Sequence, residues 1–331
     1  MIDRRSLMLG TAALGAALAT GRHALAQPRN ANWPRAMVRG TASAGGTGAI
    51  WGEGAAQIMS RATGVAMSTR TTQGPVQNIV LVDRGEIQMG IVTMGLMLQG
   101  WNGQGDWTQG RQHRNVRASI PMYDTPFQGI ALARSGISKV TDLNGKRVGL
   151  GPRGGTPGTT WPTILRNLNV TPSAIRYGSA NDMGGLLADG LIDAFLFAAG
   201  LPVAAFTELE TTQQTKHITF STQEIATLKS KMPELGDSMI PRGTYRGLTE
   251  DTPTVGIYNF MIVQKDLPDD LVFEMMKAVL TTNTDIARVH GTGKETLPQN
   301  WNKNTFLPFH PGAAKWLRDN GHRVPDNLVL R

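Results

Sequence analysis

Short apolar runs alternate with helix-like stretches along most of the chain, at the rhythm expected of β-α units. Residues 51–63 carry apolar side chains at three- and four-residue intervals, which predicts an amphipathic helix. A second helix is predicted to open at Gly74-Pro75 and to stop at Gly85, because proline is tolerated at the first helical position and glycine ends helices. Strands are predicted at residues 36–41, 65–71 and 87–93.

The second half of the chain repeats this rhythm. The pattern predicts a turn and strand over 142–151, a helix over 161–168, a helix ending near Gly190 with a strand after it, a long apolar strand over 254–263, and helices over 269–287 and 310–321. Residues 101–115 are polar and glycine-rich, which predicts a loop. Residues 117–136 read as two extended runs around a break at Tyr123-Asp124. These elements indicate an α/β protein.

The first 26 residues have the features of an export signal. Two adjacent arginines precede an apolar run over residues 7–19, and an A-x-A arrangement stands before Gln27. The run is short for a bilayer span, and Arg22 and His23 interrupt the stretch, which favours removal over anchoring. The paired arginines fit a twin-arginine signal, and an ordinary Sec signal remains an alternative. We therefore expect a mature protein in the periplasm.

Length and composition narrow the class of protein further. Of 331 residues, 305 remain after the signal, and a chain of that size usually forms more than one core, so two lobes are expected. The chain has no cysteine, which excludes disulfides, thiol catalysis and cysteine-ligated zinc. The net charge is +8, or +6 without the signal, but the only dense basic group, at residues 111–117, has no interleaved aromatic residues. A solvated basic face is expected, with no nucleic acid partner.

Two glycine-rich loops occupy equivalent places in the two halves. Residues 40–54, GTASAGGTGAIWGEG, have nearly the spacing of a phosphate-binding loop, but Gly46 stands where that loop needs lysine. Such a loop leads into a helix N-terminus, whose free N–H groups and dipole favour a small anion. The alternative is a tight turn that needs glycine only for its shape. Because "PRGGTPGTT" repeats the arrangement at residues 152–160, the two lobes could clamp one ligand between two helix N-termini.

Signatures of catalysis and of metal binding are missing. Histidines do not occur at the spacing of a helical zinc motif, and no G-x-S-x-G elbow is present. Acidic pairs lie in turns, where helix capping explains them. Triads can assemble from distant residues, so this pattern alone leaves an enzyme open. We expect a binding protein with no catalytic residue, no metal and no cofactor.

Six segments follow one another between about Val38 and Gly321: GTASAGGTG, TQGPVQNIVLVDRGEIQMGIV, DLNGKRVGLGPRGG, DGLIDAFLFAAGLP, DTPTVGIYNFMIV and FHPGAAKWLRDNG. In this order they resemble the TAXI group of solute receptors of tripartite ATP-independent periplasmic (TRAP) transporters. The resemblance implies a type II periplasmic-binding-protein fold, with two α/β lobes and a ligand cleft between them. Lobe I is expected at residues 35–124 plus 255–331 and lobe II at 125–254, with crossovers near 122–127 and 253–258.

The resemblance also implies a function. A small carboxylate or amino acid would be captured outside the cytoplasm and delivered to an ion-gradient-driven TRAP permease. The same fold serves receptors of ATP-driven importers and of sensory kinases, and an exported transferase or hydrolase is a further alternative. Neither the solute nor the oligomeric state follows from the sequence.

A ligand-binding set is predicted on this basis from both glycine-rich loops and the residues near them. Three members have structural alternatives: Asn78 as a solvent-facing helix amide, Thr93 as a helix cap, and Trp51 as a core residue. Where the family often has tyrosines after its Gly-Gly-Thr loop, this chain has Gly48, Ala49 and Ile50, which predicts a larger or less polar pocket there. The predicted set is Ser43, Gly45, Gly46, Thr47, Trp51, Gln73, Asn78, Thr93, Gly154, Gly155, Thr156 and Asp182.

Overall fold

The computed structural model describes residues 30–329, so the predicted export signal at residues 1–26 lies outside the described residues. The strands are β1 (Ala36–Gly40), β2 (Ala66–Arg70), β3 (Met89–Thr93), β4 (Val116–Leu132), β5 (Arg147–Leu150), β6 (Ala174–Tyr177), β7 (Ala194–Ala198), β8 (Thr215–Ile218), β9 (Gly236–Ile240) and β10 (Thr252–Gln264). The α-helices are α1 (Thr47–Thr63), α2 (Pro75–Asp83), α3 (Met94–Asn102), α4 (Thr156–Asn167), α5 (Ala180–Ala188), α6 (Ala204–Thr212), α7 (Thr222–Lys231), α8 (Asp269–Leu280), α9 (Thr284–Val289) and α10 (Pro311–Asp319).

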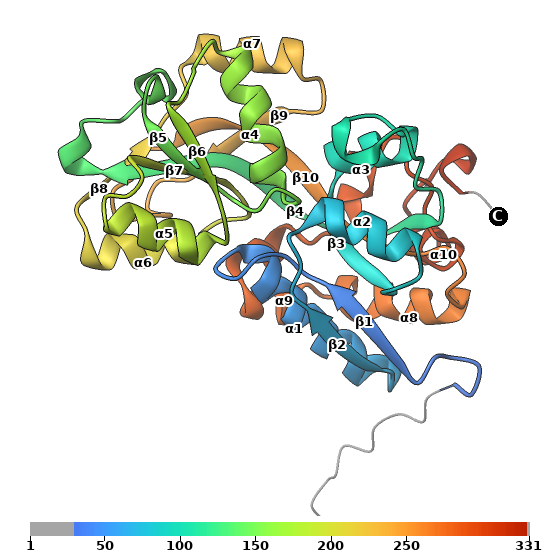
Figure 1. Ribbon diagram of the computed structural model, residues 1–331. Coiled ribbons are helices and arrows are strands. Elements are labelled where there is room, and N and C mark those ends of the chain that lie inside the picture. The colour runs from blue at the N-terminus through green and yellow to red at the C-terminus, as the bar shows by residue number, and fades with distance from the viewer. Residues whose placement is uncertain (1–29, 330–331) are drawn as a thin grey trace, which may run out of the picture.

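The strands form one continuous hydrogen-bonded path in the order β2-β1-β3-β10-β4-β7-β5-β6, with β8 beside β4 and β9 beside β10. Pairing is parallel at β1-β2, β1-β3, β5-β6 and β5-β7, and antiparallel wherever β4 or β10 takes part. The two long strands therefore run through both halves of the molecule, which appear in Figure 1 as two lobes. Lobe I holds β1–β3, α1–α3 and α8–α10, and lobe II holds β5–β9 and α4–α7.

Each lobe has its own apolar core. The lobe I cluster joins α1, α8 and α10 to the sheet and includes Met122 and Tyr123 of β4. In lobe II the side chains of β7 alternate between two clusters, because successive residues of a strand point to opposite faces. Helices α4 and α7 cover one face of this sheet and α5 and α6 cover the other. The predicted α/β fold with two lobes is confirmed.

Two predicted helices begin earlier than their sequence pattern indicates. Helix α1 starts at Thr47 instead of Trp51, and α4 starts at Thr156 instead of Trp161. Glycines in the first turns of α1 have low helix propensity, so the local pattern indicates a loop there. Close packing favours glycine in the missed first turn of α1, since an added Cβ at Gly48 would lie 3.1 Å from Ala42 Cβ.

Other boundaries also differ from the sequence pattern. The predicted break at Tyr123-Asp124 is wrong, because pairing with β10 over residues 116–126 and with β7 and β8 over residues 127–132 holds this segment as one strand, β4. The predicted helix over 269–287 is two helices, α8 and α9, with residues 281–283 between them. No prediction covers five short elements of lobe II, β6, α6, β8, α7 and β9, although the capping box from Ser221 to Glu224 marks the start of α7 in the sequence.

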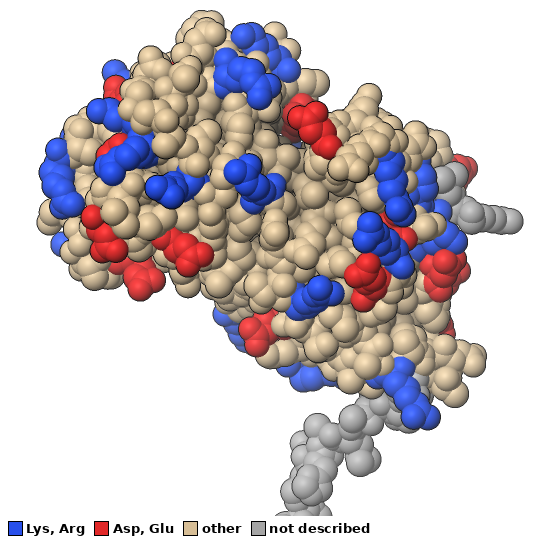
Figure 2. Space-filling model, in the orientation of Figure 1, with Lys and Arg blue, Asp and Glu red and all other residues tan. Residues whose placement is uncertain are grey.

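The molecular surface shows no concentrated charge on the face in Figure 2, where Lys and Arg are spread over both lobes and Asp and Glu lie among them. The expected solvated basic face at residues 111–117 is only partly present, because His113 and Arg117 are buried and Arg111 pairs with Asp83. Within residues 30–329, no helix is long and apolar enough to cross a membrane.

Candidate functional site

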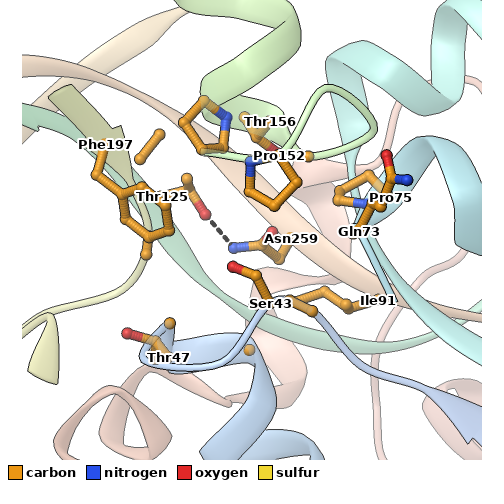
Figure 3. Close-up of a pocket in the computed structure, with 18 of the residues that line it drawn as sticks. Ser43, Thr47, Gln73, Pro75, Ile91, Thr125, Pro152, Thr156, Phe197 and Asn259 are labelled. Carbon is orange, nitrogen blue, oxygen red and sulfur yellow. Dashed lines mark hydrogen bonds between the residues drawn. The ribbon is translucent and has the colours of Figure 1, made fainter. Parts of the chain in front are cut away.

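A small pocket lies between the lobes, with a cavity volume of about 50 Å³. The N-terminal ends of α1 and α2 close it from lobe I and the N-terminal end of α4 closes it from lobe II, with β4 and β10 between them (Figure 3). Its lining residues are Ala42, Ser43, Gly46, Thr47, Gly48, Gln73, Gly74, Pro75, Ile91, Tyr123, Thr125, Pro152, Gly155, Thr156, Pro157, Phe197, Ala198, Ala199 and Asn259. None of these has a charged side chain.

The lobe I loop supplies the uncapped start of α1. The N-cap residue, Gly46, has no side chain to accept a hydrogen bond from the first turn, and its own N–H donates to the Ser43 carbonyl at 3.2 Å. Within the described part of the chain, the N–H groups of Thr47 and Gly48 have no acceptor. Free N–H groups at a helix N-terminus attract negative charge.

The lobe II loop repeats this arrangement at α4. Its N-cap is Gly155, which again gives no side-chain cap and donates its N–H to the Pro152 carbonyl at 2.9 Å. The N–H of Thr156 has no acceptor among the described residues. The pocket thus lies between two uncapped helix N-termini, one from each lobe.

The two lobes touch each other around the pocket. The Gly154 N–H donates to Gln73 Oε1 at 3.1 Å, and the Gly154 carbonyl accepts from the Val76 N–H at 3.0 Å. The hydroxyl of Thr47 donates across the cleft to the Gly200 carbonyl. These bonds define a closed arrangement of the lobes.

Strands β4 and β10 add polar groups that the sequence analysis missed. The Asn259 side chain donates from Nδ2 to the Tyr123 carbonyl at 2.9 Å and to the Thr125 hydroxyl (Figure 3). Burial raises the pKa of the Tyr123 phenol, which is therefore neutral near pH 7. One signal was present: Asn259 is an amide inside the long apolar run of residues 254–263, where a polar side chain needs a specific partner.

The structure brings six predicted residues to the pocket lining and leaves six outside it. Those in the lining are Ser43, Gly46, Thr47, Gln73, Gly155 and Thr156. Gly154 and Thr93 lie beside the pocket and bond across the lobes, the Thr93 hydroxyl to that of Thr156 at 3.1 Å. Gly45 has φ of 79°, and an added Cβ there would lie 2.0 Å from Asn181 Oδ1 of lobe II, so glycine permits this close approach.

Three predicted residues have structural partners instead. Asn78 is fully buried, and its Nδ2 donates to the carbonyls of Thr41 at 2.8 Å and of Ile91 at 2.9 Å. Trp51 is fully buried in the core of lobe I behind the pocket, as its helical spacing indicates. Asp182 caps α5 by accepting the Ser179 N–H at 3.1 Å. The solvent-facing alternative for Asn78 is wrong, and so is capping by the Thr93 side chain, which makes no such bond in α3.

Within residues 30–329, no group of three or more His, Asp or Glu side chains is arranged to hold a metal ion. Two carboxyl groups with perturbed pKa values, neither of them in the pocket lining, lie where β4 crosses between the lobes. There, burial raises the pKa values of Asp124 and Glu295, and the Asp124 N–H donates to Glu295 Oε2 at 2.9 Å.

Solved structures with a similar fold include periplasmic binding proteins. The structure of periplasmic binding protein BugD shares 15% identity at a TM-score of 0.55, over 79% of this chain and 88% of that one. The GluR0 ligand-binding core from Nostoc punctiforme, in complex with (L)-glutamate, shares 15% identity at a TM-score of 0.46, over 82% of this chain and 100% of that one. An ancestral arginine-binding protein bound to arginine shares 15% identity at a TM-score of 0.45, over 80% and 96%.

At these identities the likeness shows the fold, which is that of the type II periplasmic binding proteins. The model of the NMT1-like family matches residues 39–321, which include both glycine-rich loops and both crossing strands. The chain belongs to the NMT1-like family.

Proposed function

We propose that this chain is a periplasmic solute receptor that captures a small organic anion between its lobes and delivers it to a TRAP permease. One observation carries the proposal: the uncapped N-termini of α1 and α4, from opposite lobes, open on the same small pocket. A ligand that bonds to both ends stabilises the closed form specifically.

The proposed contacts are the free N–H groups of Thr47, Gly48 and Thr156, with the Ser43 hydroxyl and Asn259 beside them. A hydrogen bond to a charged group contributes about 1.5 to 3 kcal/mol, so a few of them suffice for micromolar affinity. Asn259 has its Nδ2 engaged and no donor on Oδ1 in the described residues, so this oxygen could accept from a ligand hydroxyl.

The lobe boundaries form part of the proposal. Met122 and Tyr123 pack in the lobe I cluster and Phe127 packs in lobe II, which supports a change of lobe at residues 124–125 on β4. On β10, Val255 and Ile257 pack in the lobe II cluster and Phe260 in lobe I. We place the return between residues 257 and 260, slightly beyond the expected start at residue 255.

The test is thermal unfolding of the chain from Gln27 onward, against a panel of carboxylates, amino acids and their uncharged amides. A ligand that binds only the folded state raises stability by RT ln(1 + [L]/Kd), about 4 kcal/mol at a thousandfold excess over Kd. Gly46→Asp puts a negative charge at the start of α1 and is expected to abolish the shift. Gly185→Asp adds the same charge at an exposed site in lobe II and is expected to leave the shift unchanged. An unshifted Tm with every compound contradicts the proposal.

Delivery to a TRAP permease needs a separate observation. A gene for a large multi-spanning permease beside this one supports it. A neighbouring gene for a nucleotide-binding subunit supports an ATP-driven importer, and one for a membrane kinase supports a sensor. Chemical turnover of a bound compound would point to a transferase or hydrolase.

A further inference from the structure

An arginine is buried in lobe I without a counter-ion. Arg39, in β1, has 0% of its surface exposed, and its Nε, Nη1 and Nη2 atoms have no hydrogen-bond partner in residues 30–329. Its guanidinium lies over the Trp51 ring, with Cζ 5.3 Å from the ring centroid. Burial lowers the pKa of Arg39 to about 10, so the group remains charged near pH 7. An isolated buried charge is costly, so its presence calls for an explanation.

The charge lies directly behind the pocket. A Cβ added at Gly52 would lie 1.8 Å from Arg39 Nη1, which places the guanidinium against the backbone of α1. Gly48, four residues earlier on the same helix, lines the pocket. Four residues of α-helix rise about 6 Å, so roughly one helical turn separates the charge from the pocket wall.

Tyr123 links the arginine to the pocket. It lines the pocket, and a Cβ added at Gly48 would lie 3.7 Å from its hydroxyl oxygen. Burial raises the pKa of this phenol, the Arg39 charge opposes that rise and the Glu295 carboxyl adds to it, so the phenol interacts electrostatically with both groups. The Tyr123 hydroxyl has no hydrogen-bond partner in the described residues, which leaves it free to donate to a ligand.

Nothing in the pocket lining balances this positive potential. The lining residues include no aspartate or glutamate, and the free N–H groups of α1 and α4 add partial positive charge. An anion is stabilised by all of these groups together. An ammonium group would be repelled by them and would find no carboxylate to pair with.

We propose that Arg39 is a specificity residue that makes the pocket select a small organic anion without an ammonium group, such as a monocarboxylate, over an amino acid. This inference rests on the proposed receptor function and deepens it. A unit charge about 10 Å away, at an effective dielectric constant of about 20, changes affinity by about tenfold. That is the expected contribution of Arg39.

The experiment compares matched compounds on matched variants. The probes are propionate, lactate and benzoate, the amide of each acid, and glycine and L-alanine, at equal ionic strength. The variants of the chain from Gln27 onward are Arg39→Met, Arg39→Lys and the control Arg35→Met, which removes the same charge from an exposed position four residues earlier. Calorimetric titration gives each Kd, and thermal unfolding without added compound gives the stability of each variant.

We expect the wild type to prefer an acid to its amide and to L-alanine. Arg39→Met should reduce the ratio of acid to amide affinity about tenfold, while Arg39→Lys and Arg35→Met keep most of it. The Tm of Arg39→Met without ligand should not fall, because removal of an unpaired buried charge is neutral or stabilising.

Four results would overturn the inference. One is an unchanged acid-to-amide ratio in folded Arg39→Met, and another is a lower Tm with that ratio intact, which would make Arg39 a structural residue. Wild-type binding of amino acids but not of the simple acids overturns the inference and leaves the receptor function standing. Failure of every compound to bind overturns both proposals.

Discussion

The side chains of Thr93 and Thr156 meet between the lobes, with their hydroxyl oxygens 3.1 Å apart. Thr93 ends β3 in lobe I, and Thr156 begins α4 in lobe II. Both side chains are buried, and neither hydroxyl has another partner in the described residues. The bond therefore exists only while the lobes are in contact, and it links the closed arrangement to two residues beside the pocket.

This bond should contribute to ligand affinity through closure. Thr93→Val or Thr156→Val leaves one buried hydroxyl unpaired and should weaken binding of the best acid in the panel about fivefold to tenfold, since a net hydrogen bond contributes about 1 kcal/mol. The double variant should lose less than the two single losses combined, because both remove the same bond. A double-mutant cycle of Kd values measures this coupling. Additive losses would instead indicate that Thr156 acts on the ligand independently of Thr93.

A side chain at position 155, in place of Gly155, should block closure of the two lobes. An added Cβ there would lie 2.8 Å from the Gln73 carbonyl oxygen of the opposite lobe, and backbone cannot move aside as a side chain can. Gly155→Ala is expected to weaken binding more than tenfold and to keep the larger radius of gyration of an open form when the ligand is added, as measured by X-ray scattering.

The matched control is Gly185→Ala in α5, where an added Cβ has no neighbour within 4 Å. It should stabilise the fold by about 0.5 to 1 kcal/mol, as alanine does in an exposed helix, with the same Kd as the wild type. Normal compaction of Gly155→Ala on ligand addition would show that the lobes close by another path.

Asn78 should matter for folding more than for binding. Its side chain joins the carbonyls of Thr41 and Ile91, and Gly40 and Gly90 give it room, since a Cβ on either would lie within 3 Å of an Asn78 atom. Asn78→Ala removes two buried hydrogen bonds, leaving the Thr41 carbonyl with only the Thr72 hydroxyl as a side-chain partner, and should lower the free energy of unfolding by about 2 kcal/mol. Urea unfolding measures the loss. The reverse pattern, normal stability with lost binding, would restore the ligand role predicted from the sequence.

Asp124 should make stability depend on pH. Burial raises the pKa of its carboxyl. The hydrogen bonds from Ser238 and the Thr125 N–H and the charge of Lys303 lower this pKa, but burial has the larger effect. The carboxyl of Glu295, whose pKa is also raised, lies beside Asp124. At pH values just above the ordinary carboxyl pKa, the folded state therefore binds more protons than the unfolded state. Stability should fall as pH rises from about 4 through the raised pKa and then level off.

Asp124→Asn keeps the size of the side chain and removes its titration, so urea unfolding from about pH 4 to pH 8 should show a smaller fall in stability. The variant should be more stable than the wild type at neutral pH and similar at the acid end. Asp189→Asn, at an exposed carboxylate in lobe II, should follow the wild-type curve. Identical slopes for Asp124→Asn and the wild type would assign the pH dependence to other groups.

The regular elements followed from local pattern where apolar spacing was strong. Strands β1, β3 and β10 and helices α2 and α10 lie where residue spacing and glycine or proline punctuation predict them. Both glycine-rich loops could also be identified in the sequence, because a helix start without a capping side chain appears there as a short run of glycine and threonine. Weakly periodic segments such as β8 and β9 had no such signature, since pairing with β4 and β10 stabilises them.

Residue spacing was thus sufficient for the α/β class and the two loops that meet at the pocket, while chain length and the family resemblance indicated the two lobes. Long-range packing decided the rest. Pairing of β10 with β4 brings Asn259 beside Thr125, 134 positions earlier, and stacking of α1 on β1 hides Arg39 behind the pocket. These contacts depend on the order of the strands and on the close approach of α1 to β1 that Gly52 allows. Both features arise only when distant segments of the chain assemble, so the local sequence pattern cannot predict them.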